Sequence, residues 1–196
     1  MSKVIVDISM SLDGFATAAN VRAEEPLGDG GERLHAWLDG DDRDRDQLRR
    51  AQQAVGVIVC GRRTYDHSLP WWGETGPSGE ARVPVVVVTG RGDAPAPGSA
   101  YTFVDGIEPA LERARELAGG SGVSILGGPD VIRQCLAARL VDELWLHVAP
   151  VLLGDGIRLF ERIGAELEPL EAIQTAAATH VRYRIGVADV PVVTVS

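Results

Sequence analysis

The stretch that most constrains the fold is an apolar run at residues 57–60 that stops at a glycine and two arginines. Its β-favouring and small apolar residues suit a strand buried on both faces. Gly61 lets the backbone turn tightly, and Thr64 can cap a following helical turn. A helix start offers unpaired N–H groups, and Arg62 and Arg63 carry forked donors that match phosphate oxygens. The segment predicts a phosphate clamp; the alternative is an ordinary strand-to-helix turn with solvated arginines.

Two further apolar strands, residues 85–88 and 123–126, end in turns of the same kind. The carboxyl ends of strands in an open α/β sheet converge on one crevice, so three such ends can surround one extended, multiply phosphorylated ligand such as a dinucleotide. The usual GxGxxG fingerprint of dinucleotide-binding folds is absent, and close strand–helix packing is the alternative reason for the paired glycines. The three turns contribute Gly61, Arg62, Arg63, Thr64, Thr89, Arg91, Gly127, Gly128, Pro129 and Asp130.

Length and composition bound the class of protein. The 196 residues favour a single domain over residues 1–196, and 24% charged with 45% apolar residues is typical of a soluble globular protein. The net charge of −9 argues against nucleic acid or an anionic membrane as partner, so any phosphate site must be local. No apolar run reaches the roughly 20 residues of a membrane span and no signal-peptide pattern is present, which favours a cytoplasmic location. Cys60 and Cys135 lack metal-like spacing, so we expect buried reduced thiols and no metal centre.

The rest of the chain predicts a sheet flanked by helices. Residues 4–8 form a strand that leads into a turn at Asp13-Gly14, and a loop rich in Gly and Asp over residues 20–46 precedes a polar helix ending near Ala54. The alternating Asp and Arg over residues 39–50 predict a solvated helix face. Helical periodicity follows over residues 107–118 and again after Pro129, a residue that suits a first helical turn.

The C-terminal part predicts antiparallel pairing. Residues 144–151 form a long strand, residues 180–185 alternate as a second, and residues 191–195 supply an edge strand in which proline is tolerated. Paired glycines within residues 150–160 predict a turn that returns apolar side chains to the core.

Several short motifs stand in the order seen in bacterial dihydrofolate reductase-like proteins. The chain resembles these proteins over essentially its whole length and is similar to the reductase domain of riboflavin biosynthesis (deaminase/reductase) proteins. The motifs are Ser11-Leu12-Asp13-Gly14, Gly61-Arg62-Arg63-Thr64, Gly127-Gly128, Leu140-Val141-Asp142-Glu143-Leu144 and residues 150–160.

The resemblance implies a three-layer α/β fold with a mostly parallel central sheet, an antiparallel C-terminal strand and helices on both faces. It also implies NADPH bound across the strand ends, hydride transfer to a small heterocycle or imine, and a homodimer. By the same resemblance Ser9 and Met10 border the nicotinamide and Ala16 lies in the loop beside it. The residues at 61–64 hold phosphates, Thr89 and Arg91 meet the adenosine 2′-phosphate, and residues 127–130 hold the pyrophosphate.

The chain departs from the family pattern on the substrate side. No residue matches the carboxylate that anchors the pterin in dihydrofolate reductases, and Leu126 stands where riboflavin-pathway reductases commonly carry glutamate. Trp37 and Trp72, with Leu126, are the expected substrate contacts, because aromatic faces stack on flat rings. Asp13 is the local candidate for proton transfer, with a purely turn-forming role as the alternative. Two functions stay open: a reductase acting on a pterin-, pyrimidine- or flavin-precursor-like molecule, or a non-catalytic NADP(H)- or nucleotide-binding protein.

Overall fold

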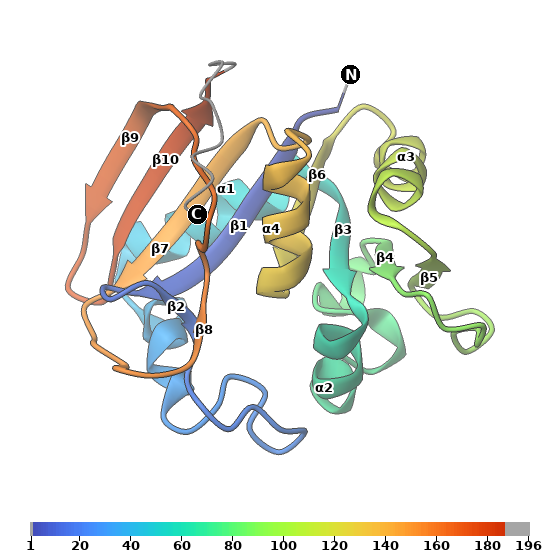
Figure 1. Ribbon diagram of the computed structural model, residues 1–196, viewed down its shortest axis with the longest axis horizontal. Helices are drawn as coiled ribbons and strands as arrows, with labels where there is room; N and C mark the ends of the chain where they lie inside the picture. Colours follow the sequence, from blue (N-terminus) through green and yellow to red (C-terminus); the bar gives the residue numbers. More distant parts are fainter. Residues whose placement is uncertain (1, 187–196) are drawn as a thin grey trace, which may run out of the picture.

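A computed structural model describes residues 2–186, and within them the chain forms one large sheet with helices on both faces (Figure 1). The strand order is β5-β4-β3-β6-β1-β7-β10-β9, with β10 antiparallel to β7 and to β9 and the other neighbouring pairs parallel. The sheet comprises β1 (Val4–Ser11), β3 (Val55–Gly61), β4 (Val85–Val88), β5 (Tyr101–Val104), β6 (Gly122–Gly127), β7 (Glu143–Ala149), β9 (Leu167–Gln174) and β10 (Thr179–Ile185). The predicted fold class is confirmed.

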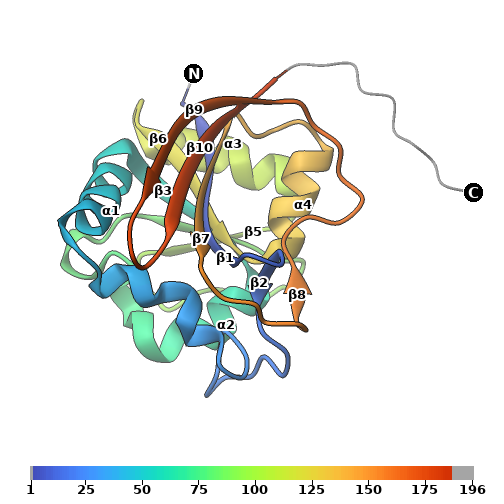
Figure 2. The same ribbon diagram turned by 90° about the vertical axis from the view of Figure 1, so that its left-hand side faces the viewer.

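Helices cover the two faces of this sheet, and a small ribbon closes one end. The view in Figure 2 has α1 on one side of the central strands and α4 on the other. Short β2 (Phe15–Thr17) and β8 (Ile157–Arg158) pair with each other apart from the main sheet. The helices are α1 (Asp42–Ala54), α2 (Arg62–Trp72), α3 (Ile107–Ala118) and α4 (Pro129–Ala137), with 3-10 segments η1 (Gly31–Asp39), η2 (Gly73–Thr75) and η3 (Gly79–Ala81).

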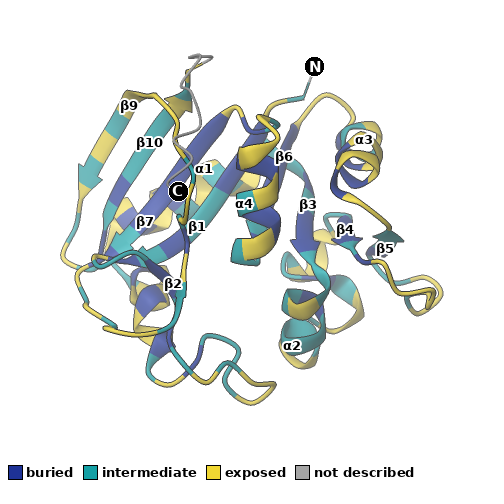
Figure 3. Ribbon diagram, viewed as in Figure 1, coloured by how far each residue is buried: buried dark blue, intermediate teal, exposed yellow. Residues whose placement is uncertain are grey.

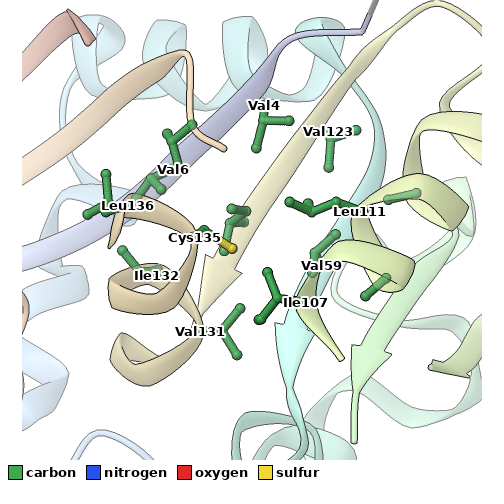
Figure 4. Packing of buried hydrophobic residues seen from close by; sticks show 14 of the residues in the cluster. Val4, Val6, Val59, Ile107, Leu111, Val123, Val131, Ile132, Cys135 and Leu136 are labelled. Carbon is green, nitrogen blue, oxygen red and sulfur yellow. The ribbon is translucent and has the colours of Figure 1, made fainter. Parts of the chain in front are cut away.

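The main core lies where α3 and α4 pack on valine-rich strands (Figure 4). The buried side of α3 carries Ile107, Ala110, Leu111, Ala114 and Ala118, which follow helical spacing as predicted. Full burial of one such leucine stabilises the fold by about 1.5–3 kcal/mol. The buried stripe of α4 includes Cys135, and both cysteines are free and buried, as expected. These helices fix the β6–α4 turn.

The other face is more polar. Here η1 and α1 cover β1, β7 and β10, and the register aligns Ser9, His147 and His180 in one row across the three strands. Figure 3 shows β1 and β7 largely buried and β9 largely exposed. The face therefore holds polar side chains under helical cover.

Four sequence expectations need correction or completion. Thr64 does not cap α2, because the helix begins at Arg62 and leaves Thr64 inside its first turn. The helix at residues 42–54 is not solvated throughout, since Asp44 and Gln47 are buried. The strand expected at 144–151 spans Glu143–Ala149, and residues 150–160 do return Leu159 to the core. The hairpin partner of β10 is β9, which was not predicted; residues 191–195 lie outside the described residues.

Candidate functional site

A cleft of about 960 Å³ crosses the carboxyl ends of the central strands. Its wall is built from the ends of β1, β3 and β6, the first turns of α2 and α4, and the segment from β2 through η1. This is the edge at which ligands bind in open α/β sheets. Of the residues expected at the site, the wall contains Ser9, Ala16, Trp37, Gly61, Arg62, Arg63, Thr64, Trp72, Leu126, Gly127, Gly128, Pro129 and Asp130.

Two helix N-termini open into this cleft. The N-cap residues are Gly61 for α2 and Gly128 for α4, and neither cap has a side-chain hydrogen bond within the described part of the chain. Their first N–H groups are thus available to an anion. The turn is tight: a Cβ added to Gly128 would lie 2.9 Å from the Thr64 Oγ1, and one added to Gly61 would lie 2.9 Å from Val131 Cγ2. The peptide bond between Gly127 and Gly128 is cis.

The two arginines of the β3–α2 turn differ in their partners. Arg62 donates from Nε to Asp66 at 2.6 Å and from Nη1 to Asp93 at 2.7 Å. The hydrogen bonds that Arg62 donates to Asp93 and Asp66 raise its pKa. Arg63 is exposed and has no ion pair or hydrogen-bond partner among residues 2–186. Arg63 is therefore the cation whose donors are all available to a ligand.

Thr89 and Arg91 lie at the end of β4 but do not line the cleft. Thr89 is buried and accepts from the Arg91 amide at 3.1 Å, while Arg91 Nη1 lies 3.2 Å from Asp66. Because Asp66 also binds Arg62, the two arginines share one carboxylate at the edge of the site.

The end of β1 contributes buried side chains to the wall. Ser9 Oγ accepts a hydrogen bond from Trp37 Nε1 at 2.9 Å, and both residues are buried. Ala16 is buried beside them. Thr17 also lines the cleft, and its buried Oγ1 has no hydrogen-bond partner among the described residues. Met10 points the other way: it packs against the core under α3 and α4 and does not line the cleft.

Asp13 lies outside the cleft wall and fastens two turns together. Its carboxylate accepts from the Leu153 amide at 3.1 Å and the Gly154 amide at 2.7 Å. The Ser11 hydroxyl, followed by these amides, lowers the pKa of Asp13 to about 2. Because both carboxylate oxygens are engaged by backbone amides of the neighbouring turn, the geometry is that of the turn-forming role.

Sequence reasoning missed Asp7 and His147, two titratable residues of the cleft wall. Asp7 Oδ1 lies 2.9 Å from His147 Nε2, and the imidazole packs beside the Trp37 ring with centroids 4.1 Å apart. The alternation of β1 was a signal that could have found them, because Asp7 and Ser9 share the face opposite the apolar Val4 and Val6.

The part of the cleft wall around the tryptophans is aromatic and partly acidic. Trp37, Trp71 and Trp72 line it with His35 and Leu126, and Glu24 and Glu25 place the acidic loop on the same wall. Burial, followed by the electrostatic effect of nearby His147, lowers the pKa of His35. A flat, neutral molecule suits such a surface better than an anion.

The chain has a dihydrofolate reductase-like fold, with its cleft at the carboxyl ends of the central strands. Dihydrofolate reductase from Enterococcus faecalis, in complex with NADP(H) and RAB-propyl, has the same fold with a TM-score of 0.59 and 14% identity, over 93% of this chain and 96% of that one. The chain belongs to the RibD C-terminal domain family, whose model matches residues 2–181. The predicted resemblance is confirmed.

Two further proteins are similar to this chain. The diaminohydroxyphosphoribosylaminopyrimidine deaminase/5-amino-6-(5-phosphoribosylamino)uracil reductase of Thermotoga maritima has a TM-score of 0.65 at 14% identity, covering 94% of this chain and 57% of that chain. The uncharacterized protein YwjB of Bacillus subtilis (strain 168) is 26% identical over 171 residues, which are 84% of this chain and 86% of that protein. At these identities the structural likeness establishes the fold alone.

Proposed function

We propose that this protein is an NADPH-dependent reductase that transfers a hydride to a small heterocyclic substrate. The observation that carries the proposal is a convergence on one cleft: within residues 2–186, two helix N-termini without a side-chain cap and Arg63 without a partner meet the cleft that also contains the Asp7–His147 pair. The helix N-termini and Arg63 suit a phosphorylated cofactor, and the Asp7–His147 pair suits proton transfer.

The residues of the cleft fit NADPH. The close approach of Gly128 to Thr64 leaves no room for a side chain, and Thr17 offers a buried hydroxyl that lacks a partner among residues 2–186. We assign the pyrophosphate to residues 127–130 and phosphate contacts to residues 61–64. Ser9 and Ala16 would border the nicotinamide, which supplies the hydride when the cofactor is bound. Arg63, together with Thr89 and with Arg91, which is joined to Arg62 through Asp66, is assigned to the 2′-phosphate region.

The substrate would lie against Trp37, Trp72 and Leu126. These side chains present apolar surface, which matches a pterin-, pyrimidine- or flavin-precursor-like ring better than a sugar phosphate. A strongly hydroxylated substrate leaves polar groups unpaired against such a wall, at about 1–3 kcal/mol each.

The competing proposal is a non-catalytic NADP(H)-binding protein. The position of Asp7 and His147 in the cleft wall favours the reductase, because pure binding requires no proton donor near the nicotinamide end. Calorimetric titration with NADPH, followed by NADPH-oxidation assays with pterins, pyrimidines and flavin precursors, separates the two. Binding together with oxidation by one of these compounds supports the reductase; binding without oxidation by any of them supports the competitor.

We further assign the protein to the cytoplasm as a single domain that acts as a homodimer. Within residues 2–186 no helix is long and apolar enough to cross a membrane.

Leu12 and Leu152 are each 67% exposed on neighbouring turns, and these turns are joined by a hydrogen bond from the Leu12 amide to the Val151 carbonyl. The two leucines offer apolar surface to a second copy of the protein. Sedimentation of the Leu152→Asp variant tests this: a wild-type dimer that becomes a monomer supports it, and a wild-type monomer refutes it.

A further inference from the structure

A chain of four titratable side chains runs from the cleft into the interior. Asp7 contacts His147 Nε2 at 2.9 Å, His147 Nδ1 lies 2.7 Å from His180 Nδ1, and His180 Nε2 lies 2.8 Å from Asp44 Oδ1. The two imidazoles and Asp44 are at most 5% exposed, whereas Asp7 lines the cleft. The residues come from β1, β7, β10 and α1.

The inner end of this chain fixes the direction of the hydrogen bonds. Asp44 Oδ2 accepts from the Asp41 amide at 2.9 Å, and Asp44 Oδ1 accepts from Thr175 Oγ1 at 2.8 Å. Asp44 also lies in the first turn of α1, where the helix dipole favours an anion. Asp44 is therefore a carboxylate, which can only accept, so His180 Nε2 must donate to it.

The donor–acceptor direction of the next two hydrogen bonds, through both imidazoles, follows from this one. Burial, opposed by the Asp44 hydrogen bond, lowers the pKa of His180, so this ring is neutral and its Nδ1 carries a lone pair. His147 Nδ1 must donate to that lone pair. The Nε2 of a neutral His147 is then an acceptor facing the carboxyl group of Asp7. A hydrogen bond there requires one more proton, held either by Asp7 as a carboxylic acid or by His147 as an imidazolium.

We propose that Asp7 is the proton donor to the substrate, kept supplied with a transferable proton by the hydrogen-bond direction that Asp44 imposes through His180 and His147. The inference rests on the proposed reductase function. When bound, NADPH would supply the hydride to the carbon of the substrate C=N bond and would be left as NADP⁺. The π electron pair moves to nitrogen, the O–H bond of Asp7 breaks, and an N–H bond forms. Asp7 is left as a carboxylate, which regains its proton from the bulk solvent.

The donor–acceptor direction of these hydrogen bonds can be measured without any substrate. Nitrogen-15 NMR of the full-length protein distinguishes Nδ1–H from Nε2–H tautomers, and the protein has four histidines whose signals must be assigned. We expect a proton on Nε2 of His180 and on Nδ1 of His147. The opposite tautomer of His180 would overturn the proposal, because Asp7 would then be a simple acceptor.

Asp44→Asn provides a sharper version of this measurement. The Asp41 amide needs an acceptor, so the Asn oxygen must face it and the Asn NH₂ must face His180. Both imidazoles should then reverse their tautomers, and the extra proton at Asp7 should be lost. Asp46→Asn is the matched control, since Asp46 is exposed on the same helix and its change should reverse neither ring. Unchanged tautomers in Asp44→Asn would overturn the proposal.

The catalytic role is tested with Asp7→Asn. General acid catalysis contributes about 10²–10⁴-fold, so substrate turnover should fall at least about 100-fold while NADPH affinity stays near the wild-type value. Asp44→Asn should lower turnover in the same direction. Equal turnover by wild type and Asp7→Asn would overturn the donor role alone. A wild-type protein that binds NADPH and reduces none of the three compound classes would overturn the proposed function, and the donor role with it.

Discussion

Replacing Arg63 by alanine should narrow the preference of the protein for NADPH over NADH. Arg62 is already held by Asp66 at 2.6 Å and Asp93 at 2.7 Å, so a phosphate must share or displace those carboxylates to reach it. Arg63 has no such partner among the described residues and can give all its donors to the 2′-phosphate, which only NADPH carries. One charge-assisted hydrogen bond contributes about 1.5–3 kcal/mol, and Arg63 is exposed, so the lower value applies. NADPH affinity should fall about tenfold.

Calorimetric titration of wild type and variant with both cofactors measures this. NADH affinity should change by less than about threefold, since NADH lacks the group that Arg63 contacts. Arg113→Ala removes the same charge from an exposed position on α3, where the side chain pairs with Glu116, and should change neither affinity. An equal loss of affinity for NADPH and NADH in the variant would refute the reasoning, because it would assign Arg63 to the pyrophosphate. Equal affinities of the wild type for the two cofactors would show that the protein has no 2′-phosphate site.

Three further predictions concern the cleft wall. Gly128→Val should lower NADPH affinity at least about tenfold in the calorimeter with the circular dichroism spectrum retained, because its side chain enters the space beside Thr64; normal binding, or an unfolded variant, would mean that the glycine serves packing. Leu126 offers no hydrogen bond, so wild type should reduce the ribosylaminopyrimidine phosphate of the riboflavin pathway poorly, and efficient reduction in a direct assay would contradict this. Thr17→Val should raise the free energy of unfolding, measured in urea, by about 1 kcal/mol, because it removes a buried hydroxyl that lacks a partner among residues 2–186, and it should weaken NADPH binding; a loss of stability would show that the hydroxyl has a partner.

Local sequence patterns were sufficient to predict the strands and helices that build the β3–α2 and β6–α4 turns of the cleft. Residues 57–61 and 85–88 are continuous apolar strands, and the five buried positions of α3 follow helical spacing. Gly61 and Gly128 were likewise recognisable, because a glycine between a buried strand and a helix is a short-range signal. These features depend on neighbours within about one turn of chain, so propensity and periodicity report them.

The polar network could not be predicted in the same way, because it depends on register and on contacts between distant segments. His147 meets Asp7 across 140 residues, and His180 meets Asp44 across 136. Asp44 looked like one more solvated member of an Asp/Arg series, and only the docking of α1 on the sheet buries it with Gln47, three residues on. The edge strand β9 was missed because most of its side chains are exposed and show no apolar alternation.

The most direct test of the account is transfer of deuterium from NADPH labelled at the reactive C4 position of the nicotinamide. Wild-type protein is incubated with the labelled cofactor and each of the pterin, pyrimidine and flavin-precursor compounds, and the masses of the products are measured by mass spectrometry. The account predicts one deuterium incorporated into the reduced product of at least one compound, with transfer greatly slowed in Asp7→Asn. Tight NADPH binding with no deuterium in any product would contradict the claim that this cleft belongs to a reductase.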